Sequence, residues 1–242
     1  MRFVAIPLIV SILIFAPGLA AQAEDATSAL PALAPAPEPE PTKPASREPE
    51  GCGSLQNAVG PYDYREAQSE RARGNLGNPS ASALIGIDNK YLSDEVQTLA
   101  SRDAALSIDL ALRAFPNHPR ALWAAVRNER RQGPPKYGAR DRLSVACYIE
   151  RALTVAGDDG LVWMLWGIYL HQNKAYRDAV VKYRHALELG VESAELNYNL
   201  GLALLKVDDV QGALAQARLA YSRDYPLNGL KRKLIKLGVW SQ

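Results

Sequence analysis

The chain has 242 residues, of which 48% are hydrophobic and 22% are charged, and its formal net charge is +2. This length suits one domain of ordinary size with tails, and the apolar content excludes a chain that is disordered throughout. A net charge so close to neutral argues against nucleic acid as the main partner, because such domains normally carry a strong basic excess.

The first 23 residues predict a cleaved signal peptide. MRFVAIPLIVSILIFAPGLAAQA combines one arginine, a long apolar run and the small residues Ala21 and Ala23, which fit a cleavage site before Glu24. The alternative is an uncleaved membrane anchor, because residues 3–21 are just long enough to span a bilayer. We therefore expect a periplasmic or secreted protein, or else one that is anchored in the membrane and faces the periplasm.

Residues 24–50 predict a proline-rich, acidic linker. They contain seven prolines and six acidic residues against two basic ones. This composition cannot bury a core and favours an extended, polyproline-like chain. Residues 51–84 follow, and the glycine, proline and tyrosine in CGSLQNAVGPYDYRE predict an ordered loop segment before the repeats described below.

The two cysteines, Cys52 and Cys147, predict a disulfide. An even number of cysteines in an exported protein favours pairing. The bridge would close a loop of about 95 residues, a constraint that chain-entropy models value at roughly 4 to 5 kcal/mol. The alternative is a buried thiol at Cys147 and an unrelated exposed thiol at Cys52, which an oxidising compartment disfavours.

Small residues recur at one period in the second half of the chain. Three pairs are each separated by 34 positions: Gly167 and Gly201, Ala179 and Ala213, and Ala186 and Ala220. The alanine series continues upstream to Ala152 and, beyond an insertion at RQGPPKYGARD, to Ala111. Small side chains at a fixed period indicate where the helices of successive hairpins approach most closely. We therefore predict an all-α solenoid of about four helical hairpins over residues 85–226, whose first helix, SDEVQTLA, is short.

Residues 227–242 predict a capping helix and tail. Leu230, Leu234 and Leu237 share one face, and Lys231, Arg232, Lys233 and Lys236 lie mostly on the others. A helical solenoid needs a terminal helix with a solvated outer face, which this pattern provides. The alternative is that this basic amphipathic helix touches an anionic membrane.

The repeat resembles the tetratricopeptide repeat, whose 34-residue unit has an aromatic residue, a leucine and a glycine in its first helix and small and aromatic residues in its second. The matching residues are Trp163, Trp166, Gly167, Ala179, Tyr183 and Ala186 in one unit, and Leu200, Gly201, Ala213 and Ala220 in the next. The stretches 52–66 and RAFPNHPRAL also resemble a group of exported proteobacterial tetratricopeptide proteins. The resemblance implies a helical-repeat solenoid and export from the cytoplasm, but no particular activity.

In such a repeat the first helix of each unit lines the concave side. The residues placed there are Trp123, Arg127, Arg130 and Arg131 in the second unit, Leu161, Met164, Ile168 and His171 in the third, and Tyr198, Leu202, Leu205 and Lys206 in the fourth. We expect a groove with an apolar floor and a basic end, which suits an acidic peptide. Two alternatives stay open: Met164, Ile168 and Leu202 are core residues, and Trp123 packs between hairpins.

The sequence contains no motif for catalysis, metal binding or cofactor binding. His118, His171 and His185 lack the spacing of a zinc site and are predicted to be surface or capping residues. The acidic pairs Asp158–Asp159 and Asp208–Asp209 fall in turns between helices, where helix capping explains them.

The prediction for function is a non-enzymatic, exported scaffold for a protein or peptide, with no cofactor, no metal and no nucleic acid. One alternative is a structural accessory subunit of an envelope assembly, whose groove is filled by its own N-terminal segment. Another is an envelope hydrolase without a recognisable motif.

Overall fold

The computed structural model describes residues 52–92, 102–135 and 143–240. These residues form ten helices and no strand, so the described part of the chain is all-α, as predicted. By its contacts the chain divides into residues 1–45 and 46–242, and every described helix belongs to the second unit. The predicted signal peptide (1–23) and linker (24–50) lie outside the described residues. Within the described ranges no helix is long and apolar enough to cross a membrane.

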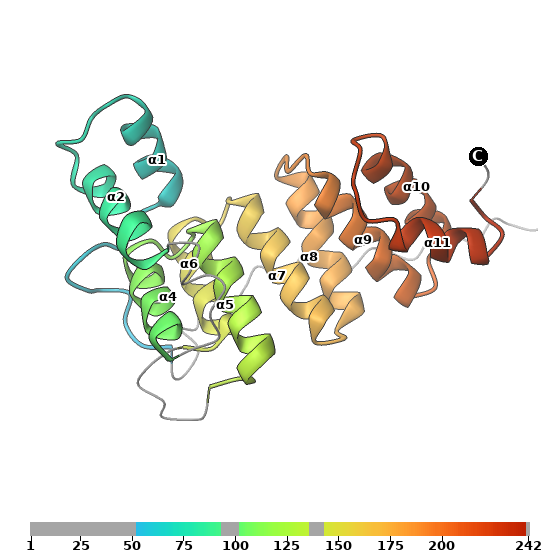
Figure 1. The fold of residues 1–242 in the computed structure, drawn as a ribbon, viewed down its shortest axis with the longest axis horizontal. Coiled ribbons are helices and arrows are strands. Elements are labelled where there is room, and N and C mark those ends of the chain that lie inside the picture. The colour runs from blue at the N-terminus through green and yellow to red at the C-terminus, as the bar shows by residue number, and fades with distance from the viewer. Residues whose placement is uncertain (1–51, 93–101, 136–142, 241–242) are drawn as a thin grey trace, which may run out of the picture. The chain divides into compact units, whose positions relative to one another are not determined.

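Labelled as in Figure 1, the helices are α1 (Tyr64–Ala72), α2 (Pro79–Tyr91), α4 (Arg102–Ala114), α5 (Pro119–Gln132), α6 (Val145–Val155), α7 (Gly160–Gln172), α8 (Tyr176–Glu188), α9 (Ala194–Lys206), α10 (Val210–Tyr221) and α11 (Gly229–Lys236). Six of them begin at a residue whose side chain accepts a hydrogen bond from the first turn: Asp63, Asn78, Ser144, Asp159, Ser193 and Asp209. Such caps satisfy amide groups that have no partner inside the helix, so they set where each helix starts.

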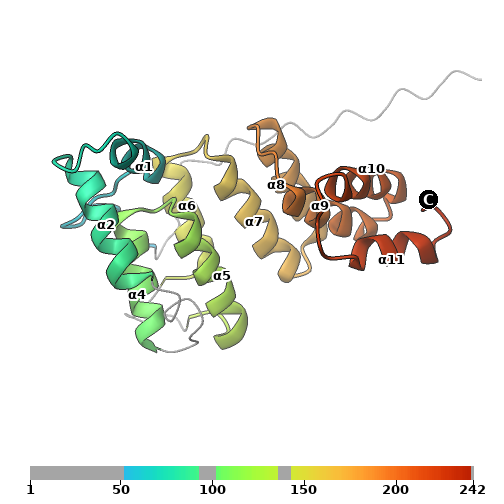
Figure 2. The ribbon, with the colours of Figure 1, turned by 45° about the horizontal axis from the view of Figure 1, so that its top comes forward.

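Successive helices pack as hairpins. Helices α7 and α8 lie side by side across a short turn, as do α9 and α10, and α8 packs against α9 (Figures 1 and 2). Upstream, α4 packs against α5, and α5 packs against both α6 and α7. The predicted insertion, residues 131–141, begins in the last turn of α5, and its residues 136–141 lie outside the described residues.

The periodic small residues lie where helices come closest. Ala111, Ala152, Ala179, Ala186, Ala213 and Ala220 are all fully buried. A Cβ atom on Gly167 would lie 2.5 Å from two ring atoms of Tyr183 in the facing helix, and one on Gly201 would lie 2.5 Å from Cδ2 of Leu230. Real Cβ atoms do not approach so closely, so a larger residue would push these helices apart. The predicted reason for the small residues is confirmed.

The N-terminal part of the described chain is more helical than predicted. Residues 51–84 were expected to form a loop, but they contain α1 and the start of α2, and α2 continues across the predicted boundary to Tyr91. Helix α1 has no periodic apolar face and buries only Ala67, whereas α2 buries Ala81, Leu84 and Ile87 at three-residue spacing, a signal that the prediction did not use. Packing of α1 against α2 stabilises both helices. The short helix expected at SDEVQTLA, 93–100, lies outside the described residues.

Helix α11 closes the end of the described helices. Leu230 and Leu234 are fully buried, as predicted for a capping helix. The prediction was wrong for Leu237, which is 53% exposed, because α11 ends at Lys236 and no longer holds this leucine on the inner face.

Cys52 and Cys147 form the predicted disulfide, with their Cα atoms 5.3 Å apart. Cys147 lies in the first turn of α6, so the bridge attaches residue 52 to this helix. A disulfide is compatible with an oxidising periplasmic or secreted location.

Candidate functional site

The predicted groove residues of α5 include two cations that are open to an outside ligand. Trp123 is half-buried and packs against the hydrophobic core, Arg127 is half-buried, and Arg130 and Arg131 are exposed. Neither Arg127 nor Arg130 forms an ion pair with any described residue. The C-terminal half of α5 therefore presents unneutralised positive charge.

The predicted groove residues of α7 are mostly interior. Met164 and Ile168 are each 6% exposed, whereas Leu161, at the start of the helix, is 44% exposed. Helix α7 packs against α5, α6, α8 and α9, so neighbours cover most of its circumference. The alternative prediction, a core role, is confirmed for Met164 and Ile168. The expected apolar floor is therefore not available on this helix.

The predicted residues of α9 are divided between interior and surface. Tyr198 is buried, with its ring centroid 4.6 Å from that of Tyr225. Leu202 and Leu205 are half-buried and pack against the core. Lys206, the last residue of α9, is exposed.

A surface hollow of about 380 Å³ lies where the α7–α8 turn meets the α9–α10 turn. It is lined by Lys174, Ala175, Tyr176, Arg177, Asp178, Lys206, Val207 and Asp208, and we call it the turn hollow. His171 adjoins it, because its ring centroid lies 5.4 Å from that of Tyr176, and Lys206 Nζ lies 5.7 Å from the same Tyr176 centroid. The structure thus brings two predicted residues, His171 and Lys206, to one place.

The sequence analysis missed the other cations of the turn hollow, Lys174 and Arg177. They belong to the turn and the start of the second helix, whereas the prediction considered only the first helix of each unit. The repeat offers no signal for them, because the positions 34 residues after Lys174 and Arg177 are Asp208 and Gln211, and only the fold shows that neighbouring turns meet.

The electrostatics of the turn hollow favour an anionic group. Three cationic and two carboxylate side chains line it. Helix α8 starts there without a side-chain cap, and the free amide groups at a helix start attract negative charge. Burial, aided by the nearby Lys206, lowers the pKa of His171, so this ring is mainly neutral near pH 7. The arrangement suits an acidic side chain with a polar neighbour.

The acidic pairs in the turns cap helices, as predicted. Asp159 Oδ1 accepts a hydrogen bond of 3.0 Å from the amide of Leu161, and Asp209 Oδ1 accepts one of 2.8 Å from the amide of Gly212. Capping therefore accounts for one aspartate of each pair.

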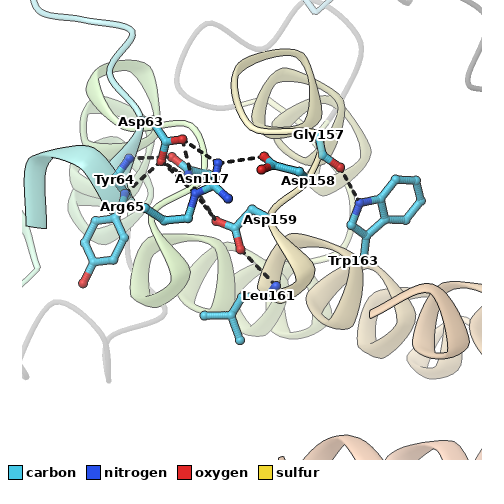
Figure 3. Close-up of polar contacts among 9 residues, drawn as sticks. All are labelled: Asp63, Tyr64, Arg65, Asn117, Gly157, Asp158, Asp159, Leu161 and Trp163. Carbon is cyan, nitrogen blue, oxygen red and sulfur yellow. Dashed lines mark hydrogen bonds and ion pairs between the residues drawn. The ribbon is translucent and has the colours of Figure 1, made fainter. Parts of the chain in front are cut away.

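A polar junction joins the segment before α1 to the turns that precede α5 and α7 (Figure 3). Buried Asn117 Nδ2 donates to Asp63 Oδ1 at 2.8 Å and to Asp159 Oδ2 at 3.0 Å. Arg65 donates to Asp63 Oδ2 at 2.7 Å and to Asp158 Oδ1 at 2.8 Å. Hydrogen bonds among these five residues occupy the carboxylates, so the junction suits a structural role rather than acid–base chemistry.

The charge state of the junction follows from the same contacts. Burial alone would raise the pKa of Asp63, but hydrogen bonds from Arg65 and Asn117 outweigh it and hold the pKa below its ordinary value. Asp63 is therefore ionised at neutral pH, and the positive charge of Arg65 balances it.

Backbone groups of residues 52–65 also contact the helices, in addition to the disulfide and the polar junction. Arg151 Nη1 donates to the three successive carbonyl groups of residues 52–54, at 2.8 to 3.4 Å. The amide of Tyr62 donates to the carbonyl of Ala114 at 2.9 Å. These contacts involve none of the predicted groove residues.

His118 departs from the predicted surface or capping role. It is fully buried, its side chain makes no cap hydrogen bond, and its Nε2 lies 3.1 Å from Asp88 Oδ1. The hydrogen bond to His118 is the main reason why the pKa of Asp88 is lowered. The prediction from the Pro-Asn-His-Pro turn was wrong because α1 and α2, which enclose this ring, were not expected. Among the described residues, no group of three or more His, Cys, Asp or Glu side chains could hold a metal ion.

The chain matches no protein-family model, and no curated protein is significantly similar to it.

Proposed function

We propose that the chain is a non-enzymatic scaffold of the tetratricopeptide type that is exported to the bacterial cell envelope and binds an acidic segment of a protein partner at the turn hollow. The 34-residue spacing of buried small residues between the α7–α8 and α9–α10 hairpins supports the repeat type. The Cys52–Cys147 disulfide supports export.

The observation that carries the proposal is the composition of the turn hollow. Lys174, Arg177 and Lys206 come from two consecutive hairpins, so one ligand segment that contacts all three bridges both repeats. Tyr176 provides an aromatic wall between them. Arginine and aromatic residues dominate the binding energy of protein interfaces, because they bury a large area and donate several hydrogen bonds.

The proposal is tested by recovering proteins from an envelope extract with the immobilised full chain. The first variant, Arg177→Glu/Lys206→Glu, reverses two charges of the turn hollow. The second, Arg127→Glu/Arg130→Glu, reverses two charges of α5 and serves as the matched comparison. We expect the wild type and the α5 variant to recover the same partner, and the turn-hollow variant to lose it.

Circular-dichroism melting of each variant shows whether the fold is retained. We expect the turn-hollow variant to keep its fold, because Arg177 and Lys206 are exposed. Loss of the partner only in the α5 variant would move the site to the basic end of α5. If both variants recovered the same partners as the wild type, neither the predicted groove nor the turn hollow would be the binding site.

A further inference from the structure

The C-terminal end of the described chain combines positive charge with exposed aliphatic side chains. Residues 225–240 contain no acidic residue and four basic ones, Lys231, Arg232, Lys233 and Lys236. Leu227, Ile235 and Leu237 are 55%, 52% and 53% exposed. We call these seven residues the basic tip.

Helix α11 has two faces that do different things. Its inner face holds Leu230 and Leu234, which are fully buried against α9 and α10. Its outer face holds Arg232 and Lys236, which lie four residues apart and are both exposed, with Ile235 beside them. The capping role requires a buried inner face and a solvated outer face, but it does not require the outer face to carry only positive charge.

The positive charge of the basic tip is not neutralised within the described chain. None of its four basic side chains forms an ion pair with a described residue. The nearest preceding acidic residue in the sequence is Asp224. Lys231 Nζ lies 5.4 Å from the ring centroid of Trp240, which places a half-buried aromatic ring in the same region.

We infer that the basic tip binds the surface of an anionic phospholipid membrane. Negative charge on a partner would attract the unpaired cations, and an apolar phase would bury the three exposed aliphatic side chains, which adds binding free energy. A layer of anionic headgroups above acyl chains supplies both within a few ångströms, which is how basic amphipathic helices lie in an interface. A second copy of the chain is disfavoured, because it would bring two basic tips together.

The inference is independent of the turn hollow, because it uses no residue of that site. It assigns α11 two simultaneous roles, a cap for the helical array on its inner face and a membrane contact on its outer face. Binding at this end would leave the turn hollow free for a protein partner.

The test is co-sedimentation of the full chain with vesicles of phosphatidylcholine, with and without phosphatidylglycerol. The wild type should bind the anionic vesicles more strongly than the neutral ones. This difference should disappear at about 1 M salt, where charges are screened beyond about 3 Å.

Two variants test the two components. Each Lys or Arg near an anionic surface strengthens binding about fivefold, so Arg232→Gln/Lys233→Gln/Lys236→Gln should weaken binding to anionic vesicles on the order of 100-fold. Ile235→Ser/Leu237→Ser should weaken it about tenfold, because two aliphatic side chains no longer enter the membrane.

The matched control, Arg73→Gln/Lys90→Gln/Arg184→Gln, removes three exposed cations elsewhere and should bind like the wild type. All variants retain the apolar residues 3–21, so any binding through that segment is common to them. The inference is overturned if the wild type shows no preference for anionic vesicles, or if the basic-tip variants bind as well as the control. Circular-dichroism spectra must first show equal helix content in every variant.

Discussion

The contact between Gly167 and Tyr183 predicts that adding a single methyl group to α7 destabilises the fold. In Gly167→Ala the new Cβ atom would lie 2.5 Å from two atoms of the Tyr183 ring and 3.0 Å from a third. This ring is fully buried between packed helices, so it cannot swing aside. Overpacking of this kind costs about 1–3 kcal/mol. It is offset by about 1 kcal/mol, because alanine favours a helix more than glycine does.

A matched substitution separates these two effects. Gly86 lies in α2, and a Cβ atom there would meet nothing within 4 Å. Gly86→Ala should therefore gain helix propensity without strain and stabilise the protein by up to about 1 kcal/mol. The difference between the two variants isolates the packing term, about 1–3 kcal/mol in the free energy of unfolding.

The assay is thermal and urea unfolding followed by far-ultraviolet circular dichroism. For a protein of this size 1 kcal/mol corresponds to a shift of about 2–4 °C in the melting temperature. We expect Gly86→Ala to melt above the wild type and Gly167→Ala to melt below Gly86→Ala by several degrees. If Gly167→Ala stabilised the protein as much as Gly86→Ala does, the explanation of the 34-residue spacing by close helix approach would be refuted.

Three further predictions concern the N-terminal segment and its contacts. Peptide mapping without reductant should recover Cys52 joined to Cys147, and free thiols in protein from the periplasm would contradict this. Cys147→Ser should lower the melting temperature, because chain-entropy models give the disulfide up to about 4–5 kcal/mol of the free energy of unfolding. Asn117→Ala should cost roughly 1–3 kcal/mol in urea unfolding, because Asp159 Oδ2 loses its hydrogen-bond donor and Asp63 loses one of its donors, and an unchanged midpoint would show that water replaces the amide. The lowered pKa of Asp88, caused first by its hydrogen bond to His118, means that this carboxylate stabilises the fold above its ordinary pKa of 3.8 and loses that contribution as the pH falls through its lowered value. Asp88→Asn should therefore be less stable than the wild type at pH 7, with the difference shrinking below about pH 4; a gap that stays constant with pH would argue against an ionic role.

The helices from α4 to α10 could be predicted because their signals are local. The 34-residue spacing of small residues, the acidic residues before helix starts and the apolar periodicity each act within one or two turns of helix. Helices α1 and α2 could not be predicted in this way. Helix α1 is short and polar, α2 lies outside the 34-residue pattern, and contact with the rest of the chain stabilises both.

The sequence could not predict which of the groove residues are exposed and which are buried. Met164 and Leu161 are both apolar residues of the same helix, yet one is buried and the other exposed. Helix α7 is apolar on nearly all sides, so its pattern cannot show which face a neighbouring helix covers. The turn hollow was missed for a related reason, since Lys174 lies in the α7–α8 turn and Lys206, 32 residues later, is the last residue of α9.

The sequence by itself determined the helical class, the period of the hairpins, the caps at Asp159 and Asp209, and the pairing of the only two cysteines. The first three depend on the types of residue at fixed short spacings. The cysteine pairing follows because the sequence contains only two cysteines. Tertiary structure alone decided that Asn117 joins Asp63 to Asp159, that His118 is buried against Asp88, and that Met164 and Ile168 are core residues. These outcomes depend on contacts between segments that are distant in the sequence. Burial and hydrogen bonding stabilise those contacts, and no short stretch of sequence shows which segments will form them.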